Sequence, residues 1–303
     1  MAVLISPEII ESVRHHRVAV IVGPTAIGKT AFSIDLARIV GGEILSADSM
    51  QVYRYMDIGT AKVDRSIRHE ITHYGIDVCD PDQSYSVGRF VEDAESHIGV
   101  AKSGGAPLII CGGTGLYVHA LLHRYVMPSV PVDPVRRHEL NRQLLECGSE
   151  SMWTVLRDLD PESAADIHPH HSSRVVRAIE LIQATGGPLR AIRQGDAHRR
   201  SDCVVIGLTA DRDVIWQNIF RRVGVMIESG LVDEVEALLH RGYSADLPSM
   251  KSIGYRETVE YLNGTLRDLD SLHSAIAVHT RQFSKRQMTW FKRLHYDYSI
   301  QMG

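Results

Sequence analysis

Short, mostly apolar runs are the most regular feature of the first third of the chain. Three of them, at residues 17–23, in "EILSA" and in "PLIICGG", have the length and composition of buried strands. Apolar positions at helical spacing occupy the stretches between, in "TAFSIDLARIV" and in residues 86–104, which begin with a capping serine and end at a glycine. Strands that alternate with helices predict a parallel sheet wound on both faces.

The pattern changes after residue 123. Prolines punctuate residues 127–134, and from there to about residue 193 the apolar spacing is helical with no convincing strand. A buried strand returns at 203–209, and residues 211–296 are mostly helical. We therefore expect an α/β catalytic core made of 1–123 and 200–303, interrupted by a helical insertion at 124–199.

Composition narrows the class of protein. With 303 residues, 44% apolar and 23% charged, the chain has the balance of an ordinary globular protein. Its longest apolar runs fall far short of the ~20 residues of a membrane span, and its N-terminal stretch has no secretory pattern. The four cysteines form no C-x-x-C pair, which excludes a cysteine-built zinc site and favours a reducing compartment. We expect a cytoplasmic protein without a membrane partner, and a monomer.

Directly behind the first strand stands "GPTAIGKT", which fits the phosphate-loop pattern G-x-x-x-x-G-K-[ST]. Two glycines allow a tight turn whose N–H groups point at oxyanions, the lysine adds a point charge, and the threonine offers a hydroxyl to Mg²⁺. This predicts a P-loop NTPase-like core that binds a polyphosphate, either a nucleotide such as ATP or another diphosphate. The residues concerned are Gly23, Pro24, Thr25, Ala26, Ile27, Gly28, Lys29 and Thr30.

The second strand of a P-loop ATPase commonly ends in an acid that holds Mg²⁺. Here "PLIICGG" ends in glycines followed by Thr114, which suits close approach of a bulky group to the backbone. The strand-end acid near the loop is Asp48, which spacing alone leaves open as a metal ligand or a general base. The missing acid therefore weakens the prediction of a small-molecule kinase, which the phosphate loop alone would favour.

A series of longer motifs resembles a known family over about residues 18–293. In order they are "GPTAIGKT", "ADSMQVYRYMDIGTAK", "YSVGRF", "GGTGLY", "RVVRAIEL", "GLVDEV", "SIGYRE" and "RQFSKRQMTWFKR". They resemble the motifs of tRNA dimethylallyltransferases, also called tRNA isopentenyltransferases. The resemblance implies transfer of a dimethylallyl group from its diphosphate to N6 of the adenine 3′-adjacent to the anticodon, in tRNAs that read U-starting codons.

The resemblance also implies roles for individual residues. Asp48 is the expected general base, Thr114 lies across the site from it, and Lys29 and Arg222 stabilise the diphosphate, with Mg²⁺ on Thr30. The expected contacts to the tRNA anticodon stem-loop, including the adenine pocket, are Asp48, Ser49, Met50, Gln51, Thr114, Arg137, Ser173, Arg174, Val175, Val176, Arg177, Lys251, Ser252, Ile253, Gly254, Tyr255, Arg256 and Glu257. One departure is Ile27, where the family usually has a small residue.

Three alternatives remain beside a tRNA enzyme. Plant and some bacterial relatives prenylate free AMP, ADP or ATP, although a mononucleotide needs no helical insertion to hold it. A kinase is supported by the phosphate loop alone, and an RNA-binding module without catalysis leaves Asp48 and Thr114 unexplained. The net charge of −4 does not favour a nucleic-acid partner, but residues 281–296 carry five basic residues and no acid. The three histidines of "IHPHH" have no acid or cysteine at ligand spacing, so we expect no metal there.

Overall fold

The structure is a computed structural model that describes residues 5–125, 133–189 and 198–303. It divides into two compact units, one formed by residues 1–121 with 200–303 and the other by residues 122–199. Most of the predicted linker 127–134 and the end of the predicted helical stretch, at 190–193, lie outside the described residues. Each unit has its own hydrophobic core.

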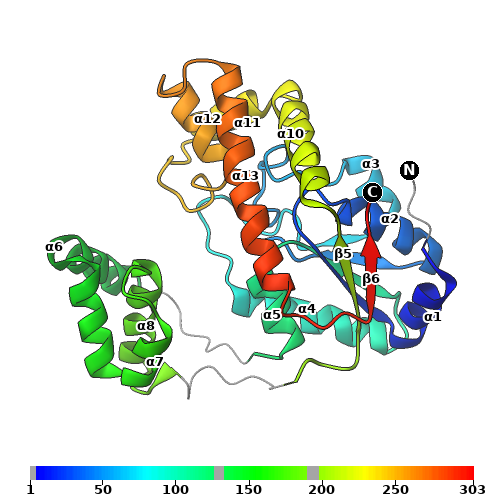
Figure 1. Ribbon diagram of the computed structural model, residues 1–303, viewed down its shortest axis with the longest axis horizontal. Coiled ribbons are helices and arrows are strands. Elements are labelled where there is room, and N and C mark those ends of the chain that lie inside the picture. Colours follow the sequence, from blue (N-terminus) through cyan, green and yellow to red (C-terminus); the bar gives the residue numbers. More distant parts are fainter. Residues whose placement is uncertain (1–4, 126–132, 190–197) are drawn as a thin grey trace. The chain divides into compact units, whose positions relative to one another are not determined.

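The described residues of the first unit form one six-stranded sheet in the order β3-β2-β4-β1-β5-β6, in which every pair of neighbours is parallel. Figure 1 shows the edge strand β6 beside β5. The phosphate loop follows β1, which lies between β4 and β5, so the loop leaves the middle of the carboxyl edge. The strands are β1 Val18–Val22, β2 Glu43–Ser46, β3 His73–Tyr74, β4 Leu108–Cys111, β5 Val204–Thr209 and β6 Tyr298–Gln301.

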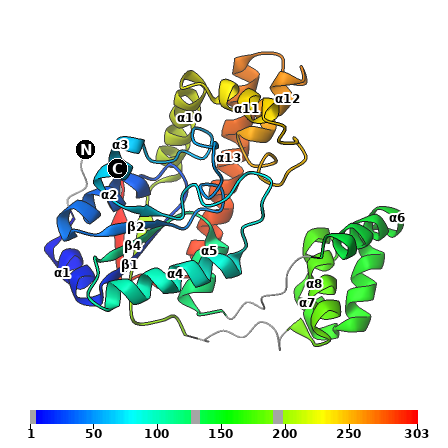
Figure 2. The same cartoon turned by 180° about the vertical axis from the view of Figure 1, so that it is seen from behind.

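Helices cover both faces of this sheet, as the alternating pattern predicts. Helices α1 (Pro7–His16) and α2 (Lys29–Val40) pack together against one face, and α4 (Val87–Lys102) packs against the other, where α5 (Gly115–Leu122) lies beside it (Figure 2). All five residues of β1 are buried, since both faces of a doubly covered strand are removed from water. The fold is an α/β fold with a P-loop-like parallel sheet.

A second core in the same unit joins the C-terminal helices to the loops that follow β2. This core contains apolar side chains of residues 50–79, of the four helices between residues 212 and 291, and of the segment before residue 255. These loops therefore rest on a helical support, whereas the short helix α3 (Arg65–Glu70) is joined to α2 by the hydrogen bonds of Glu70 with Arg38. The helices are α10 Arg212–Glu228, α11 Leu231–His240, α12 Tyr255–Leu262 and α13 Leu269–Phe291.

The insertion is all-helical in its described residues, as predicted. It contains α6 (Pro134–Leu159), which kinks at Gly148, α7 (Pro161–Asp166) and α8 (Ser172–Thr185). Helix α8 buries one continuous side, including Val175, Val176 and Ile179, against α6. None of the described helices in either unit is both long and apolar enough to span a lipid bilayer.

Every strand predicted from an apolar run is present, and Ser86 caps α4 by accepting the N–H of Arg89. The helix ends at Lys102, two residues before the predicted stop. Two edge strands were not predicted. β3 is only two residues long, and β6 alternates half-buried and exposed positions in "YSIQ", so neither has the apolar run that marks the inner strands.

Candidate active site

The phosphate loop joins β1 to α2. Its turn places Ala26 (φ 62°) and Gly28 (φ 99°) in the left-handed region, and Gly28 is the residue directly before the first turn of α2. The N-terminus of this helix therefore opens toward the loop, which is the geometry that binds oxyanions. Lys29 donates from Nζ to the carbonyl of Pro24 at 2.7 Å, so its ammonium lies over the loop. Thr30 is exposed at the same helix end.

Ile27, the departure from the usual family sequence, points away from the phosphate side. Its side chain is 3% exposed and belongs to the core cluster that includes Val13, Phe32 and Leu208. An apolar residue at this position therefore adds to packing beneath the loop.

Asp48 and Thr114 come together at the carboxyl edge, next to the phosphate loop. The hydroxyl of Thr114 accepts the N–H of Ser49 at 2.9 Å, and the N–H of Thr114 donates to Ala47 at 3.2 Å. Asp48 therefore lies between Ala47 and Ser49, which both hydrogen-bond to Thr114. The carboxylate of Asp48 accepts the N–H of Met50 at 2.9 Å. The pair is therefore held by backbone contacts from two neighbouring strands, β2 and β4.

The glycines between β4 and Thr114 are required by this close approach. A Cβ on Gly112 would lie 2.2 Å from the carbonyl oxygen of Ala47, and one on Gly113 would lie 2.3 Å from Nε2 of Gln287. Any side chain at Gly112 would push the backbone of Ala47 away and separate Asp48 from Thr114. The two glycines stand where a P-loop kinase commonly has a magnesium-binding acid. In this protein they are required by the packing of the site.

Arg222 reaches the phosphate loop from α10. Its Nη1 donates to the hydroxyl of Thr25 at 3.1 Å, while its neighbour Arg221 is exposed. Burial lowers the pKa of Arg222, and the charge of Asp48 partly offsets this. A guanidinium stays protonated despite such a shift, so Arg222 is a permanent positive charge beside the loop.

Lys29 is the other cation of the loop, and its protonation depends on pH. Burial lowers its pKa to about 8, with Cys111 and Asp48 raising it and Arg222 lowering it further. At pH 7 most of the population is therefore still charged. Above pH 8 the ammonium loses its proton, and with it the attraction to a diphosphate.

This gives a testable pH dependence. For a diphosphate donor, kcat/KM is expected to be flat up to about pH 8 and then to fall, approaching about tenfold per pH unit, because kcat/KM reports ionisation of the free enzyme. A pH series from 6 to 9.5 measures it, with Lys29→Met as the control that should lack the alkaline limb. An unchanged kcat/KM at pH 9.5 in the wild type would show that the charge of Lys29 is not needed.

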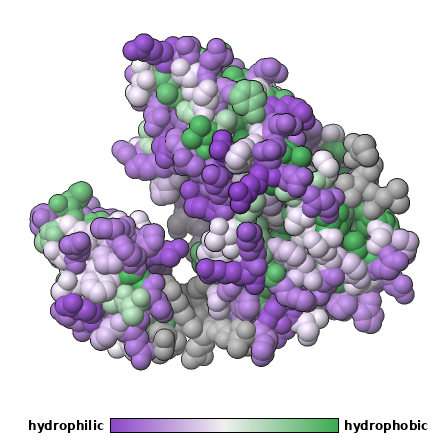
Figure 3. Space-filling view, in the orientation of Figure 1, coloured by the Kyte–Doolittle hydropathy of each residue, from purple (hydrophilic) through white to green (hydrophobic). Residues whose placement is uncertain are grey.

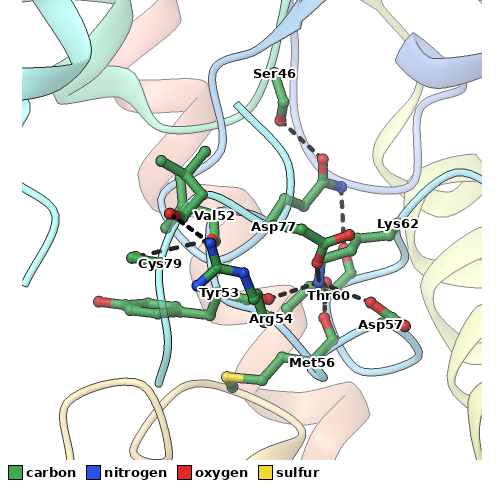
Figure 4. Close-up of polar contacts among 12 residues, drawn as sticks. Ser46, Val52, Tyr53, Arg54, Met56, Asp57, Thr60, Lys62, Asp77 and Cys79 are labelled. Carbon is green, nitrogen blue, oxygen red and sulfur yellow. Dashed lines mark hydrogen bonds and ion pairs between the residues drawn. The ribbon is translucent and has the colours of Figure 1, made fainter. Parts of the chain in front are cut away.

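The loop that follows Asp48 is locked by interactions among its own residues (Figure 4). Lys62, whose side chain is 1% exposed, donates to the carbonyl of Tyr53 at 2.6 Å and to the carboxylates of Asp57 and Asp77 at 2.7 Å each. Burial raises the pKa of Asp77, but hydrogen bonds from Lys62 and Arg68 outweigh it and bring the pKa below its usual value. The loop that follows Asp48 is thereby held in one shape.

Gln51 takes part in this internal network. Its amide oxygen accepts the hydroxyl of Ser46 at 2.8 Å, and its amide nitrogen donates to the carbonyls of Thr60 and Ala61 at 3.1 and 3.3 Å. In this conformation the amide is therefore occupied within the loop, and the contact with the adenine pocket that the resemblance implies for Gln51 stays a prediction. Gln51 shapes the loop, and Ser49 and Met50 remain half-buried beside Asp48.

Glu234 and Gln287 are two residues of the site region that sequence reasoning missed. Glu234, on α11, accepts the successive N–H groups of Asp57, Ile58 and Gly59 at 2.8 to 3.1 Å, and it accepts the hydroxyl of Tyr255 at 2.6 Å. The motif "GLVDEV" contains this glutamate, but the sequence does not indicate that its partner is a loop some 175 residues earlier. Gln287 lies on α13, within 3 Å of both loops of the site.

The predicted tRNA-contact segment 251–257 divides into a surface part and an interior part. Tyr255 and Glu257 are 0% exposed, so their assignment as tRNA contacts is corrected to support from inside. Glu257 accepts the N–H of Gly254 and, at 2.6 Å each, hydrogen bonds from Arg256 and His279. Lys251 is exposed, Gly254 is buried, and Ser252, Ile253 and Arg256 are half-buried.

The insertion shows the same division. Val175 and Val176 are 0% and 2% exposed, so they too are core residues and not contact residues, whereas Ser173 and Arg174 are exposed. Arg137 from α6 and Arg177 from α8, the latter at 2.7 Å, both hydrogen-bond to one oxygen of Glu180, which is buried. Burial raises the pKa of this carboxyl, but the two arginines outweigh it and leave the pKa below its usual value.

Fold and site together define a P-loop-like α/β protein in which the phosphate loop lies next to a strand-end carboxylate. The "IPP transferase" family model matches residues 51–294, and the "Isopentenyl transferase" model matches residues 16–72. The tRNA dimethylallyltransferase of Acetivibrio thermocellus is 41% identical over 286 residues, which are 93% of this chain and 91% of that protein. The chain belongs to the IPP transferase family.

Solved structures agree with this assignment. The full-length tRNA isopentenylpyrophosphate transferase from Bacillus halodurans is 39% identical, with a TM-score of 0.67 over 94% of this chain and 89% of that one. A eukaryotic dimethylallyltransferase acting on tRNA is 27% identical, with a TM-score of 0.73 over 90% of this chain and 69% of that one. Both the sequence and the fold are thus those of prenyl-transferring enzymes.

Proposed function

We propose that this enzyme transfers the dimethylallyl group of dimethylallyl diphosphate to N6 of the adenine 3′-adjacent to the anticodon, in tRNAs that read U-starting codons. The observation that carries the proposal is the meeting of two loops at one sheet edge. The phosphate loop with Lys29 and Arg222 lies beside the Asp48–Thr114 pair. A site for a diphosphate leaving group therefore adjoins a base and a hydroxyl suited to an amine.

The chemistry needs a proton acceptor because the lone pair of adenine N6 is delocalised into the ring. As N6 forms a bond to C1 of the dimethylallyl group, the bond from C1 to the diphosphate oxygen breaks and the amine loses a proton. Asp48 accepts that proton, and Thr114 orients the amine or a diphosphate oxygen. Lys29, Arg222 and the N–H groups at the start of α2 stabilise the charge that develops on the diphosphate.

Mg²⁺ fits the same corner. Within residues 5–125, 133–189 and 198–303, no three His, Cys, Asp or Glu side chains form a metal-holding cluster. Magnesium needs none, since it is commonly held by one or two protein oxygens together with substrate phosphates and water. Thr30, exposed at the start of α2, would hold it, and the bound ion would neutralise part of the diphosphate charge.

Exposed cations in each unit offer contacts to the tRNA backbone. In the first unit they include Lys251 and the basic residues of α13, and the part of the surface that this helix forms in Figure 3 is mostly hydrophilic. The aromatic residues of that helix serve packing, as with Phe291, which is 3% exposed. In the insertion, Arg174 is exposed. An RNA loop base flipped from its stack would then enter the site. We expect the enzyme to act as a cytoplasmic monomer.

A labelled-donor assay tests the proposal. The wild-type protein is incubated with radiolabelled dimethylallyl diphosphate, Mg²⁺ and either unmodified tRNA or AMP in separate reactions. We expect label in tRNA, with a steep dependence on salt because contacts to phosphates release counterions. Label that enters AMP alone would support the alternative that the enzyme prenylates free mononucleotides. Phosphate transfer from ATP without prenyl transfer would support the alternative that the protein is a kinase.

A further inference from the structure

One buried amide joins the two loops of the site. The side chain of Gln287, near the C-terminal end of α13, is buried, with 3% of the residue exposed. Its Oε1 accepts the N–H of Thr25 at 2.8 Å, and its Nε2 donates to the carbonyl of Gly113 at 2.8 Å. Thr25 belongs to the phosphate loop after β1, and Gly113 belongs to the loop after β4. A single side chain therefore spans the gap between them.

Each end of this bridge is next to a group with a proposed role. The hydroxyl of Thr25 receives the hydrogen bond from Arg222, on the side that binds the diphosphate. Gly113 is followed by Thr114, whose hydroxyl holds the N–H of Ser49 beside Asp48. Gln287 thus lies between the half of the site that holds the donor and the half that holds the acceptor.

The fit around Gln287 is close. A Cβ on Gly113 would stand 2.3 Å from its Nε2, much nearer than atoms in contact allow, whereas the next neighbour outside Gln287 is Nζ of Lys29 at 3.9 Å. The absence of a side chain at position 113 is therefore explained by the amide. The φ of Gly113 is not in the left-handed region, so the backbone conformation itself tolerates an alanine. The cost of Gly113→Ala is therefore the clash of its Cβ with the amide of Gln287.

We propose that Gln287 is a positioning residue that fixes the distance between the diphosphate cradle and the Asp48–Thr114 pair. The proposal rests on the proposed function, because it is the attack of N6 on C1 that makes this distance matter. A displacement of about 1 Å between reacting groups can lower a rate about 100-fold. Gln287 need touch neither substrate to have that effect.

The test replaces Gln287 by methionine, which keeps the length of the side chain and removes both hydrogen bonds. We expect kcat for prenyl transfer to fall about 100-fold, because the two halves lose their fixed spacing. The affinity for inorganic diphosphate, measured by calorimetry, should change less than about fivefold, since Lys29, Arg222 and the helix end remain. Gln282→Ala, at an exposed position of the same helix, is the matched control and should change neither quantity.

A second pair of variants approaches the same bridge from the other side. Gly113→Ala alone should displace the amide and lower kcat about as much as Gln287→Met does. With Gln287→Ala in the same chain the space is free, so the double variant should be no slower than Gln287→Ala alone. Coupling of this kind marks residues in contact, whereas independent effects add.

The outcomes separate the two claims. A wild-type protein that transfers no prenyl group to tRNA would overturn the proposed function. An active wild type in which Gln287→Met matches Gln282→Ala would overturn the positioning role alone. Losses that add in the double variant, or equal losses in kcat and in diphosphate affinity, would do the same, because a general loss of structure produces both.

Discussion

Replacing Asp48 by asparagine is expected to lower kcat for prenyl transfer by about 10²–10⁴-fold, the usual contribution of a general base. An amide cannot accept the proton that N6 loses. The amide oxygen can still accept the N–H of Met50, so the loop is expected to keep its shape. The KM values for donor and tRNA should therefore remain close to those of the wild type. Steady-state kinetics with saturating Mg²⁺ measures the effect.

The matched control is Asp82→Asn, which removes the same charge from an exposed loop position and should leave kcat unchanged. The experiment also decides between a base and a magnesium ligand, the choice that spacing alone leaves open. If higher Mg²⁺ concentration restored the rate of Asp48→Asn, the carboxylate would be a metal ligand. A loss below tenfold would likewise contradict its role as base.

Lys29→Met is expected to have the second-largest effect, a fall of about 10²–10³-fold in kcat/KM for the donor. This is the magnitude lost when one group that stabilises developing negative charge is removed. The ammonium lies over the phosphate loop, and burial makes the fixed charge more effective than it would be in water. Calorimetric titration with inorganic diphosphate should show weaker binding in parallel, since this cation also contacts the ground state.

Arg221→Met is the control for Lys29. It removes one positive charge from the exposed side of α10, next in sequence to Arg222, and should lower kcat/KM less than about threefold if long-range attraction is screened by salt. An equal loss in both variants would mean that general positive charge, and not the position of Lys29, holds the diphosphate.

The central fold could be predicted because its signals are local. The inner strands are mostly apolar runs, and the phosphate loop with its glycines, Lys29 and Thr30 is contiguous in the sequence. The insertion was predicted from a change of periodicity at one point in the chain. The structure brings Asp48, Thr114, Lys29 and Arg222 to one edge of the sheet, and their roles remain predictions that the variants above test.

What could not be predicted depends on which way a side chain points and on contacts distant in the sequence. A motif does not show whether a residue faces in or out, so Tyr255, Glu257, Val175 and Val176 were assigned to the tRNA interface although they are buried. Gln287 bonds to residues 262 and 174 positions away, a relation that only the folded chain reveals.

The most direct measurement of the function is product mapping on a single tRNA. Two transcripts of a tRNA that reads a U-starting codon are compared, one with adenine and one with guanine at the position 3′-adjacent to the anticodon. After incubation with dimethylallyl diphosphate and Mg²⁺, each is digested to nucleosides and analysed by mass spectrometry. We expect N6-isopentenyladenosine from the first transcript and none from the second. Prenylated adenosine from both transcripts, or from neither, would contradict the proposed function.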